Sequence, residues 1–311
     1  MKVLKMSVDK LLDYKLNDLV FVLLPLFVLL AVIEILAIYI FKFKTKNDTK
    51  EWFLNIFLGL SSFPINASFG FITIAALFWA KSYQIYTLPF TLPVLVICFI
   101  LDDFRFYLHH RIVHRWRWGW GLHRAHHTSE RFALDVGARQ PWTKHFTGTM
   151  MLKVPLVLIG FDPIMVLFCG FMNAYYQFLL HTQTIKKLPA WYEYIFNTPS
   201  HHRVHHGKNP KYLDANYAGT LIIWDRLLGT FVPEDEKDLP DYGLVDPLDT
   251  YNPARILFGE YWNIVKDVSQ KGISLKARFM YLFGPPGWSH DGSRKTSTDI
   301  KADYYRALKN N

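Results

Sequence analysis

Long apolar stretches constrain this chain more than any other feature of its sequence. Residues 52–80 carry no charged side chain, and residues 19–41 carry only Glu34. About 20 consecutive apolar residues let a helix cross the hydrocarbon core of a bilayer, so both stretches predict membrane helices. Residues 19–41 are too long for the core of a signal peptide, which predicts a retained anchor. Pro64 inside residues 52–80 predicts either one kinked helix or a broken one.

Two further regions are apolar. Residues 88–101 run directly into Asp103, which predicts a third helix that leaves the membrane and carries the next residues on its end. Residues 147–180 form two apolar arms around a Gly-Phe-Asp-Pro turn at 160–163, which is typical of a membrane hairpin. The first arm is short and contains Lys153, so a re-entrant segment is the alternative for it. The pattern predicts an all-α, polytopic membrane bundle with about four to five membrane segments.

The histidines are concentrated in the middle of the chain. Residues 103–127 hold six of the thirteen, and twelve lie between 109 and 206. Intervals of three and four residues place imidazoles on one face of a helix, and His181 ends the second arm of the hairpin at the same face. Neutral imidazole is the commonest protein ligand for transition metals. The candidate metal ligands are His110, His114, His123, His126, His127, His181, His202, His205 and His206.

Nine imidazoles exceed the four to six ligands that one metal takes, so they predict two metals. An all-imidazole set suits iron, zinc or copper better than magnesium or calcium. The remaining histidines are interpreted as ordinary surface or core residues. Arg111, Arg124 and Arg203, which lie inside the motifs, are expected to point away toward carboxylates or lipid head groups. The tryptophans at 116, 118 and 120 are interpreted as an interfacial belt.

The charge and the cysteine content of the chain indicate which kinds of partner it binds. The net charge of +9 occurs beside apolar runs, which favours anionic lipid head groups over nucleic acid. The two cysteines, Cys98 and Cys169, are too few for a cysteine-ligated iron–sulfur cluster, so electrons are expected from an external donor. Basic residues gather in the 42–50 loop and around the histidines. The positive-inside rule therefore predicts a multi-pass protein with its histidine-rich helical cap, and the dimetal site, on the cytoplasmic face.

The order of these motifs resembles the fatty acid hydroxylase / sterol desaturase superfamily of integral membrane di-iron enzymes. HRxxH is followed by HxxHH and, after the hairpin, by a second HxxHH; a DxxxYxxHR pattern is matched by Asp103, Tyr107, His110 and Arg111. HTQTIKKL, NTPSHHRVHHGKNPKYLDANYAG, IIWDRLLGTFVPE and the ARQ at 138–140 resemble the alkylglycerol monooxygenase branch. The resemblance covers about residues 90–250.

The resemblance implies two iron ions, for which zinc can substitute, held by the nine histidines. It also implies O2-dependent hydroxylation of a lipid C–H bond, with an ether lipid as the substrate of that branch and tetrahydrobiopterin as its external reductant. A bacterial inner membrane or the endoplasmic reticulum is the implied location. Some members carry a further histidine where this chain has Gln177, so one metal is expected to have fewer protein ligands or a water. Support for the ligands is expected from Asp103, Gln177, Asn216 and Asp225, and Asp103 is expected to accept an N–H from a ligand imidazole.

The chain divides into N-terminal membrane helices at 1–102, a catalytic domain at 103–255 that includes the hairpin, and a C-terminal amphipathic and tail region at 256–311. The tail after Ser289 is expected to be mobile. A lipid chain is expected to reach the metals from the bilayer through a tunnel lined by residues of 88–101 and 163–180. The tunnel candidates are Phe99, Phe171, Tyr175 and Phe178.

Three alternatives remain at this point. A lipid or sterol desaturase on the same scaffold differs only in a second hydrogen abstraction, which the sequence does not separate from hydroxylation. A metal transporter would place its ligands in mid-membrane, whereas these histidines lie beyond the helix ends. A zinc membrane hydrolase would need fewer histidines and a catalytic glutamate, for which Glu130 and Glu193 are the nearest candidates.

Overall fold

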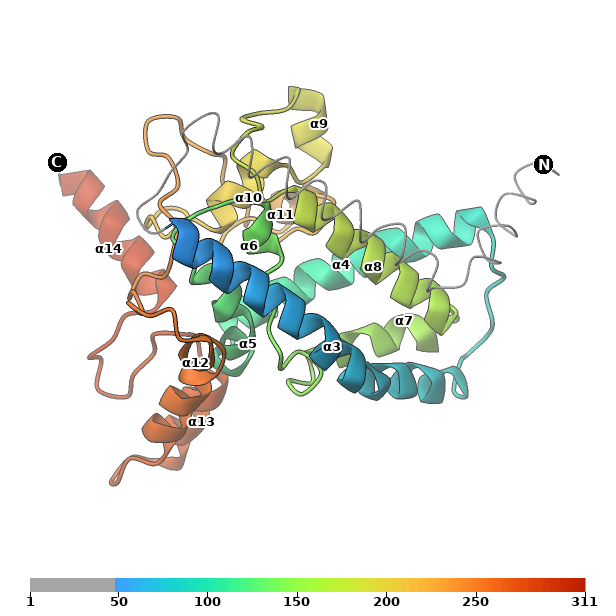
Figure 1. The fold of residues 1–311 in the computed structure, drawn as a ribbon, viewed down its shortest axis with the longest axis horizontal. Helices are drawn as coiled ribbons and strands as arrows, with labels where there is room; N and C mark the ends of the chain where they lie inside the picture. Colours follow the sequence, from blue (N-terminus) through green and yellow to red (C-terminus); the bar gives the residue numbers. More distant parts are fainter. Residues whose placement is uncertain (1–47, 311) are drawn as a thin grey trace.

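Helices make up the regular secondary structure of residues 48–310, the part of the chain that the computed structural model describes (Figure 1). Within these residues the only β-type pairs are two isolated bridges, so the predicted all-α class is confirmed there. The anchor predicted at 19–41 lies outside the described residues. The helices are α3 (Asp48–Lys81), α4 (Leu92–Arg115), α5 (Arg117–His127), α6 (Leu134–Gly137), η1 (Thr149–Lys153), α7 (Val154–Leu158), α8 (Pro163–Leu179), α9 (Ala190–Ile195), α10 (Pro199–His205), α11 (Ile223–Leu227), α12 (Pro253–Val268), α13 (Leu275–Phe283) and α14 (Ser297–Asn310).

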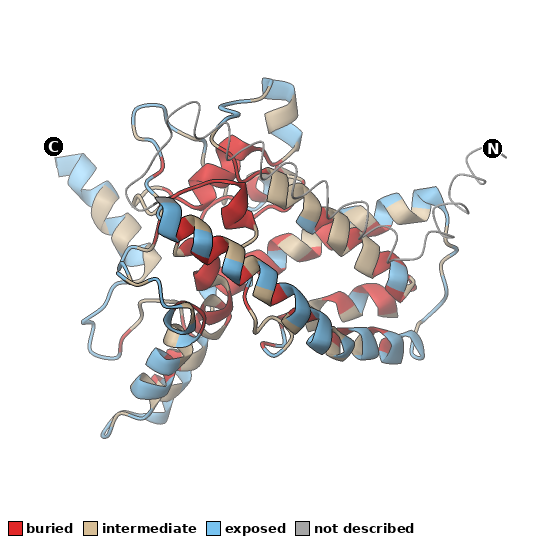
Figure 2. Cartoon of the chain, in the orientation of Figure 1, coloured by how far each residue is buried: buried red, intermediate tan, exposed pale blue. Residues whose placement is uncertain are grey.

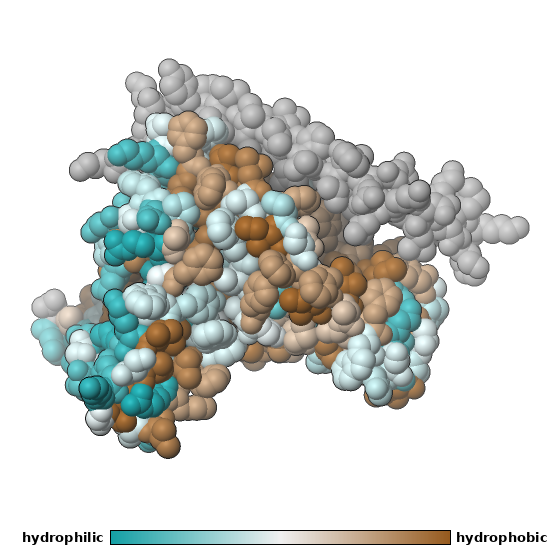
Figure 3. All heavy atoms as spheres, turned by 60° about the horizontal axis from the view of Figure 1, so that its bottom comes forward, coloured by the Kyte–Doolittle hydropathy of each residue, from teal (hydrophilic) through white to brown (hydrophobic). Residues whose placement is uncertain are grey.

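Helix α3 is one continuous helix of 34 residues that runs through Pro64. Within the described residues it is the helix that is long and apolar enough to cross a bilayer, whereas Thr149–Leu158 and α8 are shorter apolar helices. Its outward side chains include Leu60, Phe71 and Trp79, which are more than half exposed. Hydrophobic residues gather on the face where α3 runs (Figure 3). The predicted number of membrane segments stays a prediction.

Helix α4 carries the first histidines, as the sequence predicted. Pro93 stands in its first turn, where a missing N–H costs nothing, and the helix continues through His110 and His114 to Arg115. Its first half packs against α8 and its second half against α5. One long helix therefore joins the apolar bundle to the histidine-rich part of the molecule.

Lys153 is not a stray charge in an apolar arm. Its ammonium lies 3.0 Å from the carboxylate of Asp102, which also accepts a 2.8 Å hydrogen bond from Arg105. All three side chains are buried. Burying a charge is expensive unless it is paired, so Lys153 is retained in this arm because Asp102 faces it from α4.

The hairpin turns at Gly160, whose φ of 113° favours glycine. A Cβ there would also lie 2.7 Å from the carbonyl oxygen of Tyr86. Asp162 then accepts a 2.8 Å hydrogen bond from the main-chain N–H of Ile164 and caps α8. The two arms pack against α3 and α4 around one apolar cluster whose buried members include Leu77, Cys98, Leu156, Val157, Phe161, Met165, Val166 and Cys169.

The buried residues are densest where the end of α4 meets α5, α6, α10 and α11 (Figure 2). Helices α12 and α13 pack on each other and on α5. The tail after Ser289 was expected to be mobile, but residues 297–310 form α14, and Arg294, Lys295, Ser297 and Ile300 line a pocket. Asp299 pairs with Thr296 at the start of this helix, and the mobility of the tail stays a prediction.

Candidate metal centre

The nine predicted ligands come together in two groups. Within each group one side-chain nitrogen from every histidine lies within 4.8 Å of the others. Helices α4 and α5 and the residue at the end of α8 supply six of them, and the α10 segment supplies three. The five-histidine group is His110, His114, His123, His127 and His205; the four-histidine group is His126, His181, His202 and His206. That they bind metal stays a prediction.

Main-chain carbonyl groups fix the orientation of three of these rings. Nδ1 of His110 lies 2.8 Å from the carbonyl oxygen of Tyr217, and Nδ1 of His205 lies 3.0 Å from that of Ala215. Nδ1 of His181 lies 2.9 Å from the carbonyl oxygen of Gln177. A carbonyl only accepts, so each Nδ1 carries the proton and each Nε2 presents a lone pair to its group.

The chemistry of the donor set fits a cation in each group. In the four-histidine group, Nε2 of His181 lies 3.1 Å from that of His126 and 3.0 Å from that of His202. In the five-histidine group the buried Nε2 atoms of His114 and His205 have no hydrogen-bond partner among the described residues. Converging lone pairs and unpartnered buried nitrogens are costly without a cation, and a metal between them satisfies both.

Burial lowers the pKa values of eight of the nine rings and keeps them neutral. It lowers the pKa of His181 to about 4, and it holds the pKa values of His123, His202 and His206 well below the ordinary value. Neighbouring imidazoles lower the pKa values of the last three further. Neutral imidazole is the form that ligates metals, so the pocket is ready for a metal at neutral pH.

Asp103 supports the site in a different way from the one predicted. Its carboxylate accepts hydrogen bonds from the main-chain N–H groups of Thr220 and Leu221, at 2.7 and 3.0 Å, and from the indole of Trp224 at 2.9 Å. The expected contact with a ligand imidazole is not made. Asp103 stands seven positions before His110, about 10 Å along α4, so it reaches the chain that orients the histidine rather than the ring.

Asn173 connects Asp103, through Gln177, to His181 of the four-histidine group. Its amide nitrogen donates to Asp103, and its amide oxygen accepts a hydrogen bond from Gln177. Gln177 in turn contacts His181 through its main-chain carbonyl. A Cβ on Gly219 would lie 2.3 Å from the Asn173 oxygen and 2.8 Å from Asp103. Glycine is therefore favoured at position 219, because these two side chains occupy the space that a Cβ would need.

Asp225 and Asn216 hold the main chain around the α10 histidines. Asp225 accepts 2.8 Å hydrogen bonds from the N–H groups of Tyr217 and Ala218, and burial raises its pKa to about 6. Asn216, at a φ of 54°, donates from its side chain to the carbonyl oxygens of His201 and Val232. Their side chains act on the loop that carries the Tyr217 carbonyl; no hydrogen bond joins them to an imidazole among the described residues.

The four histidines interpreted as ordinary residues lie outside both groups. His145 contacts Thr73 and His290 contacts Tyr281 through Nδ1, at 3.0 and 2.6 Å. Two of the three arginines within the motifs pair with carboxylates as predicted: Arg124 pairs with Glu260, and Arg203 pairs with Glu234 at 2.6 Å. Arg111 instead donates a 3.1 Å hydrogen bond to the hydroxyl group of Tyr107.

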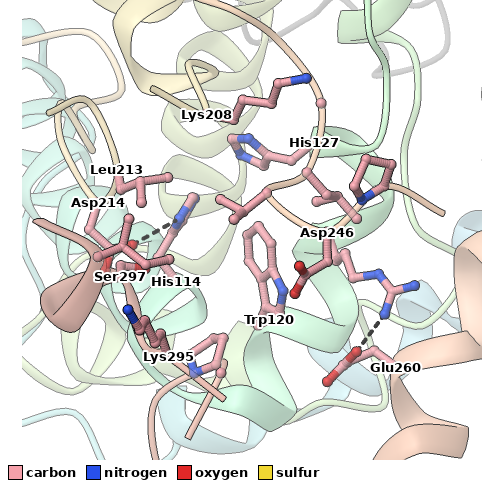
Figure 4. A pocket seen from close by; sticks show the side chains of 18 of the residues that line it. His114, Trp120, His127, Lys208, Leu213, Asp214, Asp246, Glu260, Lys295 and Ser297 are labelled. Carbon is pink, nitrogen blue, oxygen red and sulfur yellow. Dashed lines mark hydrogen bonds and ion pairs between the residues drawn. The ribbon is translucent and has the colours of Figure 1, made fainter. Parts of the chain in front are cut away.

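A pocket of about 410 Å³ reaches the centre from the side of α12 and the C-terminal segment (Figure 4). Its lining includes His114, His127 and His205 of one group and His206 of the other. The rest comes from α5 and α12, from residues 207–214 and 243–248, and from the C-terminal segment. None of the predicted tunnel residues lines this pocket. Phe99 packs instead against the apolar cluster between α4, α7 and α8.

Sequence reasoning missed several residues of the site. Asp214 lies 3.7 Å from Nδ1 of His114, and the carbonyl groups of Ala215 and Tyr217 orient two rings. All three stand in the LDANYAG stretch, in which the sequence suggested a role for Asn216 alone. Trp120, interpreted as part of an interfacial belt, lies with its ring centroid 5.2 Å from that of His114. Trp116 stacks on Phe283 rather than facing outward.

A helical protein that brings nine imidazoles together in two groups has the architecture of a histidine-based dinuclear centre. Residues 95–230 match the fatty acid hydroxylase family, and this segment belongs to that family. This match and the relatives described below together confirm the resemblance to the superfamily and to its alkylglycerol monooxygenase branch.

The curated relatives carry lipid-related names. The chain is 38% identical to an alkylglycerol monooxygenase of Xenopus tropicalis over 67% of its own length and 46% of the relative. It is 34% identical to that of Homo sapiens over 85% of its length and 58% of the relative. It is 30% identical to an ornithine lipid hydroxylase of Rhizobium tropici over 53% and 50%. The chain thus spans about half the length of the relatives it matches. No solved structure matches it.

Proposed function

We propose that the protein is a membrane-bound, O2-dependent di-iron enzyme that hydroxylates a C–H bond of a lipid. The observation that carries the proposal is the pair of buried histidine groups, five and four strong, in which the described residues place no carboxylate. The names of the relatives support lipid hydroxylation, and the alkylglycerol monooxygenases favour an ether lipid. In such a substrate, hydroxylation beside the ether oxygen gives a hemiacetal, which breaks into an aldehyde and an alcohol.

The chain's own residues prepare the site for this chemistry. Two iron ions, when bound, supply the activation of O2. His110, His205 and His181 donate Nδ1–H to main-chain carbonyls, which holds their lone pairs in fixed directions. Asp103 and Asp225 hold the loop that supplies the Tyr217 carbonyl. All nine rings but His123 are buried, which limits their contact with bulk water.

A lipid chain is proposed to approach along α8. Phe171, Tyr175 and Phe178 stand at i, i+4 and i+7, a spacing that forms one stripe on a helix, and all three are half-buried. The stripe ends beside His181, because Phe178 and His181 both lie against Gly137. Each CH2 removed from water along such a path contributes about 0.8 kcal/mol. Phe99 would then contribute to the tunnel by packing behind this stripe of aromatic side chains.

The proposed function also includes a membrane location, a topology and an electron donor. The apolar face of α3 supports a membrane location, and the basic residues near the histidines support a multi-pass arrangement with the metal face in the cytoplasm. Tetrahydrobiopterin, the reductant implied by the branch, is proposed as the external electron donor.

A zinc hydrolase is less well supported. One of its two sequence candidates for a general base, Glu193, accepts hydrogen bonds from Thr198 and Ser200 at 3.1 and 2.8 Å and from the main chain of Leu188. That carboxylate caps the segment before α10, and it belongs to neither histidine group.

The test is a product analysis with the iron-loaded protein in lipid nanodiscs, an alkylglycerol, a reductant and isotopically labelled O2. The proposal expects one labelled oxygen atom in the aldehyde, because the inserted oxygen becomes its carbonyl, and no label in the alcohol, which keeps the ether oxygen. It also expects two irons per chain by metal analysis. A product that has lost two hydrogens and gained no label identifies a desaturase. Cleavage that proceeds without O2, in protein that holds zinc, identifies a hydrolase and overturns the proposal.

A further inference from the structure

Helices α12 and α13 form a hairpin that projects from the histidine-rich part of the molecule (Figure 1). Each helix carries an exposed stripe of large apolar side chains: Phe258, Trp262 and Val265 on α12, and Leu275, Phe279 and Phe283 on α13. Spacings of three and four residues place each set on one face of its helix. Leu275 is 84% exposed and Trp262 is 60% exposed. Contiguous exposed apolar surface of this kind marks an interaction site.

The exposed charged side chains of this hairpin are all basic. They belong to Arg255, Lys266, Lys271 and Lys276. The two carboxylates of α12 are less exposed and face α5 instead: Glu260 lies 2.8 Å and Asp267 lies 2.7 Å from nitrogen atoms of Arg117. The outer surface of the hairpin therefore combines apolar stripes with positive charge, which complements an anionic surface.

The hairpin meets α3 at the point where the charge-free run of that helix begins. One buried cluster joins the elements, and it comprises Leu54 and Leu58 of α3, Ala125 of α5, and Ile256 and Leu257 of α12. The ring of Phe258 lies 6.2 Å from that of Trp142, which lies 6.4 Å from that of Phe57 on α3. Residues 52–80 carry no charge, and the end of such a run lies at the lipid–water interface when the helix crosses a bilayer. Helix α12 thus stands at the level of that interface.

These features favour a lipid surface over a protein partner. Protein interfaces are depleted of lysine, whereas three of the four exposed basic residues of the hairpin are lysines. Helices that lie on a bilayer carry lysine and arginine on the polar face and tryptophan, phenylalanine or leucine on the other. The two stripes contain all three of these apolar residue types.

We propose that the α12–α13 hairpin is an interfacial membrane contact, with its apolar stripes in the headgroup region and its basic side chains on anionic lipid headgroups. The inference rests on the membrane location in the proposed function, and it adds a second contact to that of α3. Helix α5, on which both helices pack, carries His123, His126 and His127. The hairpin therefore sets the distance between the bilayer surface and the histidine groups.

The test measures whether position 275 contacts lipid in the full chain. Leu275→Cys is labelled with a fluorophore in nanodiscs of phosphatidylcholine and phosphatidylserine, and quenching is measured with a lipid-borne nitroxide and with water-soluble iodide. Leu239→Cys is the matched control, because Leu239 is an exposed leucine in the acidic loop at 235–241, which anionic lipids repel. Cys98 and Cys169 are buried, and the unchanged chain measures their background labelling.

Strong quenching by the lipid-borne nitroxide and weak quenching by iodide are expected at position 275, with the reverse at position 239. Strong iodide quenching with weak lipid quenching at 275 would place the stripe in water. Weak quenching by both agents would show that a second copy of the chain or another protein covers it. Either of these two results overturns the inference.

A pair of charge variants tests the assignment to anionic headgroups. Lys271→Gln/Lys276→Gln removes two charges beside the label, and each lysine near an anionic surface strengthens attraction to it about fivefold. Lipid quenching at position 275 should therefore fall in the anionic discs and stay the same in discs of phosphatidylcholine alone. Lys237→Gln/Lys309→Gln removes equal charge at exposed positions elsewhere and should leave the quenching unchanged. Equal quenching of both variants in anionic discs would contradict the assignment.

A label on α3 separates this inference from the proposed membrane location. Leu60 is an exposed residue of the charge-free run, so Leu60→Cys should be quenched strongly by the lipid-borne nitroxide. Strong lipid quenching at 60 with none at 275 would overturn the hairpin contact alone. Absence of lipid quenching at both positions would overturn the proposed membrane location as well.

Discussion

Nδ1 of His110 lies 2.8 Å from the carbonyl oxygen of Tyr217, although the two residues stand 107 positions apart in the chain. The segment around Tyr217 is held by the side chains of Asp225 and Asp103, which accept hydrogen bonds from its main-chain N–H groups. Ring orientation at the centre is thus set by main-chain atoms of a loop, and two buried carboxylates hold that loop.

Replacing Asp103 with asparagine is expected to destabilise the protein and to lower its metal content together. The amide nitrogen would face N–H donors, and the charge that strengthens the hydrogen bonds to Thr220 and Leu221 would be lost. Hydrogen bonds to charged groups contribute about 1.5–3 kcal/mol each, so a loss of about 3 kcal/mol is expected in denaturant unfolding. Asp162→Asn, at a less buried helix cap, is the control. Equal unfolding midpoints in both variants would contradict this role of Asp103.

Gly219→Ala is expected to destabilise the protein more than the addition of one methyl group usually does. The new methyl group would lie 2.3 Å from the oxygen of Asn173 and 2.8 Å from that of Asp103. Overpacking of this kind costs about 1–3 kcal/mol, and the displaced carboxylate would release Thr220. Gly70→Ala is the matched control, because no atom lies within 4 Å of its Cβ. Thermal unfolding and metal analysis compare the stability and the metal content of the two variants. Equal values would mean that Asn173 and Asp103 shift to make room for the methyl group at little cost.

The sequence predicted the helices and the histidines well because both signals are local. The charge-free run at 52–80 and the spacing of His123, His126 and His127 depend on neighbours in the chain, so periodicity reveals them. The structure places α3 and the two histidine groups accordingly. The division of nine histidines into five and four was not foreseen, because His205 and His206 are adjacent in sequence yet join different groups.

The supporting contacts were harder to predict because they involve main-chain atoms and distant partners. No residue type identifies a carbonyl that accepts from an imidazole, as those of Tyr217 and Ala215 do. Asp103 looked like a partner for a histidine because of its spacing on one helix, but the chain brings Thr220 to it from 117 positions away. The pocket combines residues from the centre and the tail, a proximity that only the fold creates.

Loss of one ring from the five-histidine group should release metal. His205→Ala removes a buried nitrogen that has no other partner among the described residues, and losing one ligand weakens a site severely. About one metal per chain is expected to remain in purified His205→Ala, and turnover should be abolished. Similar loss of turnover is expected for alanine at His110, His123, His127, His202 or His206.

His290→Ala is the control for these variants, because His290 contacts Tyr281 and lies in neither group. It should keep both metals and its activity. Full metal content in His205→Ala, or loss of metal in His290→Ala, would show that the two groups are assigned wrongly.

Acid is expected to destabilise the metal-free protein through the buried imidazoles. Burial lowers the pKa of His181 to about 4 and that of His206 well below the ordinary value, whereas an imidazole in an unfolded chain titrates near 6.5. Between about pH 6.5 and pH 4 the unfolded chain therefore binds more protons, so the free energy of unfolding falls as the pH falls. For His181 the loss is about 2 kcal/mol at about pH 5. Above about pH 6.5 both states are neutral, and these groups contribute no slope.

Denaturant unfolding of metal-free protein between about pH 5 and pH 8 measures this dependence. His181→Gln removes one of the buried imidazoles, so its stability should fall less steeply below about pH 6.5 than that of the unchanged chain. Metal-loaded protein should resist acid until protons displace the metal, which metal analysis of the dialysed protein detects. If stability instead rises on acidification, the folded protein binds protons at these rings, and the neutral state that the centre requires is wrong.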